Sequence, residues 1–206
     1  MASLQEERSA ETRRKLLDAT LECLSRYGYA GTTTTEIARR AGVSRGAQLH
    51  HFPHKKELVV SALEHVFELR LAQFRQVVAE MPASVEAKVD TLIEMLWLGF
   101  KGPTFYAWLE LVMASRTDTD LRKAIGCISK DFGEGIHRVF EIIFGPAFDA
   151  NLLEFAIFGL LEAMAIERVL FASPQEEDER IGCALDALKS IARSLVGRDR
   201  DGAATR

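Results

Sequence analysis

Apolar residues recur at intervals of three and four along most of the chain, which is the period of an amphipathic α-helix. The first such stretch, Glu11–Tyr27, has Leu16, Leu17, Leu21 and Leu24 on one face. No stretch alternates with a period of two for long enough to predict a strand. The pattern therefore predicts an all-α protein.

Glycines, prolines and capping residues divide these periodic stretches. The polar ends, Met1–Glu7 and Gly197–Arg206, are predicted to be frayed. The predicted helices are Glu11–Tyr27, Thr34–Ala41, Ser44–Phe52, Lys55–Met81, Val85–Phe100, Phe105–Ser115, Leu121–Phe144, Leu152–Phe171 and Pro174–Val196.

The segment from residue 33 to residue 55 carries the features of a helix-turn-helix. Thr33 and Glu36 have the spacing of a capping box at the start of a short helix. Ala38 is small enough to let a second helix cross, and Gly42, four residues later, tolerates a positive φ in the turn. Ser44 then caps the second helix. The alternative is a pair of short helices inside an ordinary bundle.

Composition places the chain among ordinary globular proteins. Of its 206 residues, 48% are hydrophobic and 27% are charged, a balance that excludes a disordered chain. No apolar run approaches the roughly 20 residues of a membrane span, and the charged N-terminus has no signal-peptide core. We therefore expect a cytoplasmic protein without a membrane partner.

The charge is divided unevenly along the chain. Residues 1–60 carry ten Lys and Arg against seven Asp and Glu, whereas the rest carries 16 against 23. A basic head on an acidic body favours a polyanionic partner for the head alone. Chance scatter of surface charge explains an excess of this size equally well.

The sequence offers little for catalysis or metal binding. It has no nucleophile elbow, no glycine-rich phosphate loop and no H-E-x-x-H motif, so we expect no enzymatic activity and no cofactor. The three cysteines are too scattered for a metal site and are expected to be small core residues. Pro53 breaks the helical face that His50 and His54 would share as ligands.

Residues 9–69 resemble the DNA-binding domain of TetR/AcrR-type helix-turn-helix transcriptional regulators. The resemblance covers the first helix, Tyr27-Gly28-Tyr29 with the threonines, the helix-turn-helix, and Phe52-Pro53-x-Lys55-x-x-Leu58. It implies a three-helix DNA-binding head (9–69), joined by a long helix to a helical ligand-binding and dimerisation domain (70–198) and followed by a flexible tail (199–206).

The resemblance also implies DNA contacts. Members usually carry Leu and then Tyr where this chain has Gln48 and Leu49. If Leu49 turns inward, Gln48 is free to pair with an adenine edge; otherwise Gln48 is a structural residue, and the sequence leaves both open. The implied DNA-binding residues are Thr33, Thr34, Ser44, Arg45, Gly46, Ala47, Gln48, His50, His51 and Lys55.

The last two predicted helices point to a homodimer. Leu152–Phe171 is apolar nearly all round, and the final helix has an apolar seam with a 4-3-4-3 spacing. Two such helices from each subunit would form a four-helix bundle. The alternative is that both complete a monomer core. The predicted interface residues are Leu153, Leu160, Leu161, Ile181, Leu185, Leu188, Ala192 and Leu195.

Aromatic residues gather in the middle helices, either as core or as an apolar effector pocket with a few polar contacts from residues such as Glu110. The candidate pocket residues are Trp97, Phe100, Tyr106, Trp108, Met113, His137, Phe140 and Phe158.

Together these features predict a homodimeric repressor that binds an inverted-repeat operator in double-stranded DNA and is released by a small, largely apolar effector. The long helix from Lys55 would carry the effector's signal to the head. The alternative is a helical dimeric interaction or ligand-binding module whose helix-turn-helix no longer binds DNA specifically.

Overall fold

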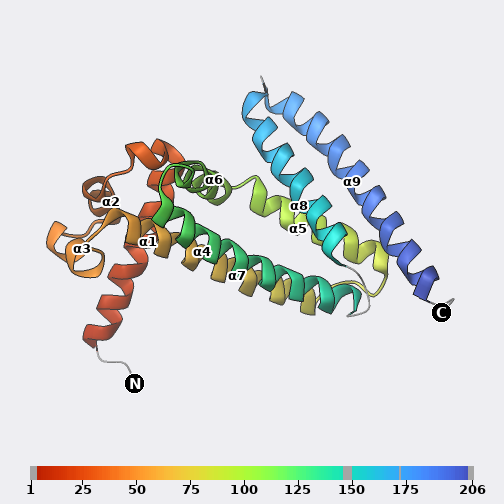
Figure 1. Ribbon diagram of the computed structural model, residues 1–206, viewed down its shortest axis with the longest axis horizontal. Helices are drawn as coiled ribbons and strands as arrows, with labels where there is room; N and C mark the ends of the chain where they lie inside the picture. Colours follow the sequence, from red (N-terminus) through yellow and green to blue (C-terminus); the bar gives the residue numbers. More distant parts are fainter. Residues whose placement is uncertain (1–3, 146–149, 172, 204–206) are drawn as a thin grey trace. The chain divides into compact units, whose positions relative to one another are not determined.

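The computed structural model describes residues 4–145, 150–171 and 173–203. Over these residues the chain is helical and has no β-strand, which confirms the predicted all-α class (Figure 1). The elements are α1 (Leu4–Gly31), α2 (Thr34–Ala41), α3 (Arg45–His51), α4 (Lys55–Ala79), α5 (Val85–Phe100), α6 (Pro103–Ser115), α7 (Thr119–Phe144), α8 (Ala150–Glu167), the 3-10 turn η1 (Arg168–Leu170) and α9 (Pro174–Ala203).

The observed helix ends differ from the predicted ones mainly at the outer elements. Helices α2 and α5 have the predicted bounds. Helix α1 begins at Leu4 and α9 extends to Ala203, so both predicted frayed ends are helical over their described residues. Helix α8 ends at Glu167, and η1 follows it in place of the α-helix predicted to reach Phe171.

The chain forms two compact units, each made of two separate segments. The first holds the described part of Met1–Arg70 together with Gly102–Phe132, and the second holds Leu71–Lys101 together with the described part of Gly133–Arg206. Helices α4 and α7 each contribute to both units, because a unit boundary falls inside each of them. The functional division at residue 70 stays a prediction.

Two clusters of buried apolar side chains form the core of the first unit. One joins α1, α2 and α4 with the end of α3, and its largest members are Leu16, Leu17, Ile37, Phe52 and Leu58. The other joins α1 and α4 to α6 and α7 through Leu24, Val59, Leu63, Leu111 and Leu121. Helix α6 and the first half of α7 therefore stabilise the same unit as the predicted helix-turn-helix.

The cysteines only partly follow the prediction. Cys23 is buried in the first cluster, whereas Cys127 and Cys183 are exposed. The expectation that all three are core residues is therefore wrong, because the helical faces of α7 and α9 place the latter two outward.

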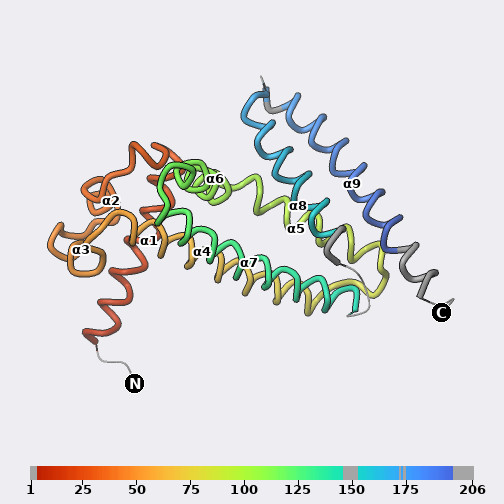
Figure 2. Tube along the Cα trace, in the orientation of Figure 1, coloured from red at the N-terminus to blue at the C-terminus, as the bar shows by residue number. Residues whose placement is uncertain are grey.

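In the second unit, α5, α8 and α9 pack on one another, and α8 and α9 run side by side (Figure 2). Two ion pairs support the packing of α9 on α5. Lys189 Nζ lies 2.7 Å from Glu94 Oε1, and Arg193 binds Asp90 through two guanidinium nitrogens. Among the described helices, none combines the length and apolarity needed to cross a membrane.

Candidate nucleic-acid interface

Helix α2 begins with half of the predicted capping box. The Thr33 hydroxyl accepts a hydrogen bond from the Glu36 N–H at 3.2 Å, which satisfies one of the unpaired N–H groups of a helix start. The Glu36 carboxylate does not return to Thr33 but pairs with the Arg39 guanidinium at 2.6 and 2.7 Å. The Arg39 hydrogen bond holds the pKa of Glu36 below its usual value.

The turn after α2 has the conformation expected of a helix-turn-helix. Gly42 has φ 66° and ψ 30°, in the left-handed region, and the Val43 N–H donates to the Ala38 carbonyl at 3.1 Å. A Cβ on Gly42 would meet nothing within 4 Å. The position therefore needs glycine for its backbone conformation and not for space.

Helix α3 starts where predicted, and its Gln48 lies inside the protein. The Ser44 hydroxyl accepts from the Ala47 N–H at 3.1 Å. Gln48 is 0% exposed, and its amide nitrogen donates to the Phe52 carbonyl at the end of the helix. Its Oε1 is buried without a partner. A side chain enclosed in this way presents no edge to a base, so the structure contradicts the base-reading hypothesis and supports the structural one.

Leu49 points about 100° around the helix from Gln48, and its side chain is 46% exposed. Of the two alternatives that the sequence left open, the structure excludes the one in which Leu49 turns inward and Gln48 is free. With Gln48 in the core, Leu49 lies at the surface of α3. The exposed face of α3 consists of Arg45, Gly46, Leu49 and His50.

Arg45 is held across the starts of both helices. Its Nη1 donates to the Thr34 hydroxyl at 2.8 Å and to the Thr35 hydroxyl at 2.9 Å. These partners are neutral, so they fix the guanidinium without cancelling its charge. Two predicted DNA contacts, Thr34 and Arg45, are thus brought together. At Gly46, an added Cβ would have the Ser44 Oγ, at 3.9 Å, as its nearest neighbour.

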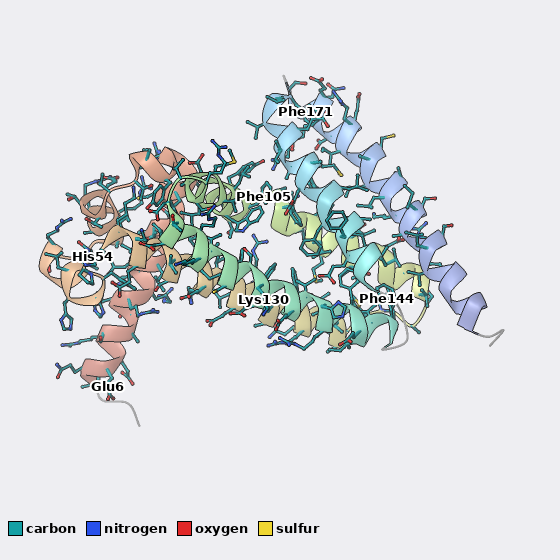
Figure 3. All side chains as sticks on the ribbon, viewed as in Figure 1. Glu6, His54, Phe105, Lys130, Phe144 and Phe171 are labelled. Carbon is teal, nitrogen blue, oxygen red and sulfur yellow. The ribbon has the colours of Figure 1, made fainter. Side chains whose placement is uncertain are left out.

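The histidines lie at the end of α3 and in the turn beyond it. His50 is exposed and His51 is half-buried, with ring centroids 5.4 Å apart. Burial lowers the pKa of His51, and the nearby His50 and Arg13 charges add to this effect. His54 is exposed in the following turn (Figure 3). No trio of His, Cys, Asp or Glu side chains in the described ranges is arranged to hold a metal ion.

Lys55, expected to bind a phosphate, is engaged inside the first unit. Its ammonium donates to the Tyr29 carbonyl and lies 4.2 Å from the centroid of the Tyr29 ring. Partial burial lowers its pKa. Lys55 therefore joins the start of α4 to the end of α1, and a phosphate contact would require it to leave these partners.

Two acidic residues that position the head were not recognised as such from the sequence. Glu110 on α6 accepts the Tyr29 N–H at 3.0 Å, and it approaches Gly28 (φ 65°) so closely that a Cβ there would lie 2.7 Å from its Oε2. Asp118, before α7, binds the Lys56 ammonium at 2.9 Å. Glu110 was expected to contact an effector. Its partner is 81 residues away, and no local pattern reveals such a pair.

The candidate pocket residues fall in different units. Tyr106, Trp108 and Met113 belong to α6 in the first unit, where Met113 is exposed. The other five belong to the second unit, where Phe100 meets Phe158 edge to face at 5.5 Å between centroids. The five residues of the second unit are Trp97, Phe100, His137, Phe140 and Phe158.

A groove of about 620 Å³ runs between α7 and α8 in the second unit and includes two of the candidates, His137 and Phe158. His137 Nδ1 lies 3.1 Å from Glu154 Oε2. Phe155 and Arg138 also line the groove, so that aromatic and charged groups share it.

Five of the eight predicted dimer-interface residues are buried within this chain's own core: Leu153, Leu161, Ile181, Leu188 and Ala192. Their assignment to a dimer interface is therefore wrong, because the apolar seam of α9 packs against α5 and α8 of the same chain. Leu160 is exposed, and Leu185 and Leu195 are half-buried.

These helices and their turn define a helix-turn-helix domain of the kind found in transcriptional regulators. Residues 16–62 match the family described as "Bacterial regulatory proteins, tetR family". An uncharacterized HTH-type transcriptional regulator of Mycobacterium bovis is 28% identical over 187 residues, which cover 88% of this chain and 94% of that protein. The helix-turn-helix domain of this chain therefore belongs to the tetR family of bacterial regulatory proteins.

Solved structures share the fold along most of the chain. A tetR-family transcriptional regulator from Mesorhizobium loti, described as putative, aligns with a TM-score of 0.71 at 16% identity, covering 92% of this chain and 97% of that one. FadR from Bacillus subtilis, solved in complex with stearoyl-CoA, aligns with a TM-score of 0.63 at 20% identity, covering 90% and 96%. At these identities the likeness concerns the fold.

Proposed function

We propose that this tetR-family regulator is a homodimeric repressor that binds an inverted-repeat operator and leaves it when a small, largely apolar effector binds. The observation that carries the proposal is the exposed face of α3, where Arg45 is fixed by two threonine hydroxyls. A short recognition helix reads few bases, and two of them about 34–36 Å apart read a near-palindrome.

The proposed phosphate and base contacts come from the exposed or partly exposed members of the predicted set. Arg45 and His50 lie on the outer face of α3, and Thr33, Thr34 and Ser44 lie at the helix starts beside it. Gln48 and Lys55 act from inside: the first packs the end of α3, and the second joins α4 to α1.

A revised surface on α8 supports the dimer. Phe155, Gly159, Ala163, Ile166 and Leu170 recur at spacings of four and three along α8 and η1, and all five are exposed. Phe155 is 79% exposed and Leu170 is 81% exposed. Large apolar surfaces that face water mark interaction sites, and a self-complementary patch suits a two-fold dimer.

The effector would bind in the second unit, beside His137 and Phe158. The FadR structure from Bacillus subtilis contains stearoyl-CoA, a ligand with a long apolar chain, and this precedent in the same fold supports a largely apolar effector. Because α4 belongs to both units, it would transmit a change in the second unit to the head.

The alternative is a helix-turn-helix that has lost specific DNA binding. That alternative rested on the unusual Gln48 and Leu49. The core accommodates Gln48 through its bond to Phe52, so the departure from the common pattern leaves the motif intact.

The direct test is selection of bound sites from random duplex DNA by the purified protein at near-physiological salt. We expect an enriched inverted repeat and an affinity that falls steeply with salt, because phosphate contacts release counterions. No enrichment together with salt-insensitive binding would refute the DNA-binding proposal. Effector candidates can then be screened for release of the selected site.

The dimer needs its own measurement. Ile166→Lys places a charge in the exposed α8 patch, where the side chain is 47% exposed and not part of the core. Sedimentation velocity should show a dimer for the natural protein and a folded monomer for the variant. A dimer that tolerates Ile166→Lys and Phe155→Glu together would show that the subunits meet elsewhere.

A further inference from the structure

The exposed face of α3 contains an apolar side chain at its centre. This face is formed by two pairs of residues four positions apart, Arg45 with Leu49 and Gly46 with His50. Residues at this spacing lie on the same side of a helix. Arg45 and His50 carry polar or charged ends, whereas Leu49 can neither donate nor accept a hydrogen bond. A leucine at this position cannot form the phosphate contact that a polar side chain could make.

The fold holds Leu49 in this place. Gln48 occupies the inward direction and is anchored through its amide to the Phe52 carbonyl. Turning Leu49 inward would expel Gln48 from the core. The outward position of Leu49 is therefore set by the packing of α3 and not by the freedom of a surface side chain.

The surroundings of Leu49 allow another molecule to come close. One turn earlier, Gly46 has no side chain, and its nearest neighbour would be 3.9 Å from an added Cβ. Beside it, the charge of Arg45 is fixed by Thr34 and Thr35. The missing side chain at Gly46 lets the helix backbone approach DNA closely. The positive charge of Arg45 then complements the phosphates that border the major groove. The exposed apolar group of Leu49 complements the thymine C5-methyl, an apolar group on the floor of that groove.

We propose that Leu49 packs against the C5-methyl group of a thymine in the major groove, and that it is a specificity-determining residue of this regulator. The inference rests on the proposed function, because it needs α3 to lie in the groove. Unlike a phosphate contact, the contact between Leu49 and the thymine methyl discriminates between bases. The methyl group alone provides this discrimination.

The test uses the selected operator with single thymines replaced by deoxyuridine, which keeps every hydrogen-bonding group and removes only the methyl. At one thymine in each half-site, the natural protein should lose about four-fold in affinity, the value for burying one methyl-sized group. Replacement in both half-sites should cost about 15-fold, since the two contacts are independent.

Variants at position 49 connect this loss to the leucine. Leu49→Ala should bind the thymine operator more weakly and show no further loss with deoxyuridine at that position. Leu49→Met keeps an apolar side chain of similar volume and should retain the deoxyuridine penalty. Arg45→Ala is the matched control from the same face: it should weaken binding to thymine and deoxyuridine operators by the same factor. Circular dichroism confirms that each variant is folded.

The outcomes separate the two proposals. Tight, salt-dependent operator binding with no deoxyuridine penalty at any thymine would overturn the role of Leu49 and leave the proposed function standing. A penalty that persists in Leu49→Ala would assign the methyl contact to another residue and also overturn it. If no duplex is bound specifically, the proposed function fails, and the role of Leu49 fails with it.

Discussion

The assignment of Gln48 to the core leads to a sharp prediction about stability. Gln48→Leu removes the hydrogen bond to the Phe52 carbonyl, a loss of about 1 kcal/mol of stability. It also removes the buried Oε1 that has no partner, and this relieves a cost of about 1–3 kcal/mol in the natural protein. The two effects oppose each other, so the free energy of unfolding should change by less than about 1 kcal/mol, or rise.

Gln48→Glu should behave very differently, although it has the same shape. At neutral pH it places a carboxylate in a fully buried site facing the Phe52 carbonyl oxygen, with no donor to satisfy it. We expect a loss of about 3 kcal/mol or more, measured by urea denaturation followed by circular dichroism. Gln73, an exposed glutamine on α4, is the matched control, where the same two changes should stay within about 0.5 kcal/mol.

The operator sequence that the Gln48→Leu variant selects provides a second test. Because Gln48 is enclosed, Gln48→Leu should select the same operator sequence as the natural protein. A Gln48→Glu protein as stable as the natural one, or a Gln48→Leu protein that prefers a different base at one position, would refute the core assignment.

Three further predictions follow from the first unit. Gly28→Ala should lower the free energy of unfolding by about 2 kcal/mol or more, because Gly28 has a positive φ and an added Cβ would lie 2.7 Å from Glu110. In urea denaturation, the double variant with Glu110→Ala should recover only the part of this loss that comes from the steric clash. Lys55→Met keeps the apolar stem and removes the ammonium that donates to the Tyr29 carbonyl, so we expect it to lower the free energy of unfolding by about 1 kcal/mol. The dependence of DNA affinity on salt concentration should stay unchanged. A weaker salt dependence would show that Lys55 does reach a phosphate. Partial burial lowers the pKa of His51 in the folded protein, so the unfolded chain binds more protons below about pH 6.5, and the stability falls as the pH drops through that value. Between about pH 7.5 and pH 5.5, the melting temperature should therefore fall less for His51→Gln than for the natural protein. Equal falls in the two proteins would contradict a lowered pKa of the His51 imidazole.

The sequence predicted the helix-turn-helix well because its boundaries are set by neighbouring residues. Thr33 and Ser44 each cap a helix through a backbone N–H three residues later, and Gly42 ends α2 through its own φ. Such features depend on the chain within one turn, so a pattern of residue types is enough to locate them.

The orientation of adjacent residues was not predictable in the same way. Gln48 and Leu49 both fit a helix, and only the packing of α3 in the first unit decides which one faces inward. Likewise, the apolar seam of α9 predicted a buried face, but the sequence could not say whether α5 of the same chain or a second copy covers it. Ile181, Leu188 and Ala192 are covered within the chain.

The basic residues of the predicted head differ in the partners that they bind in the structure. Arg39 is paired with Glu36, Arg40 with Glu22, and Lys56 with Asp118, so these three cations are already neutralised by carboxylates. Arg45 is different, because its partners are the neutral hydroxyls of Thr34 and Thr35. The excess charge read from the sequence is therefore not spread evenly over the head. Part of it is concentrated beside Leu49, where one helix face combines a fixed positive charge for the DNA backbone with an apolar group for a base.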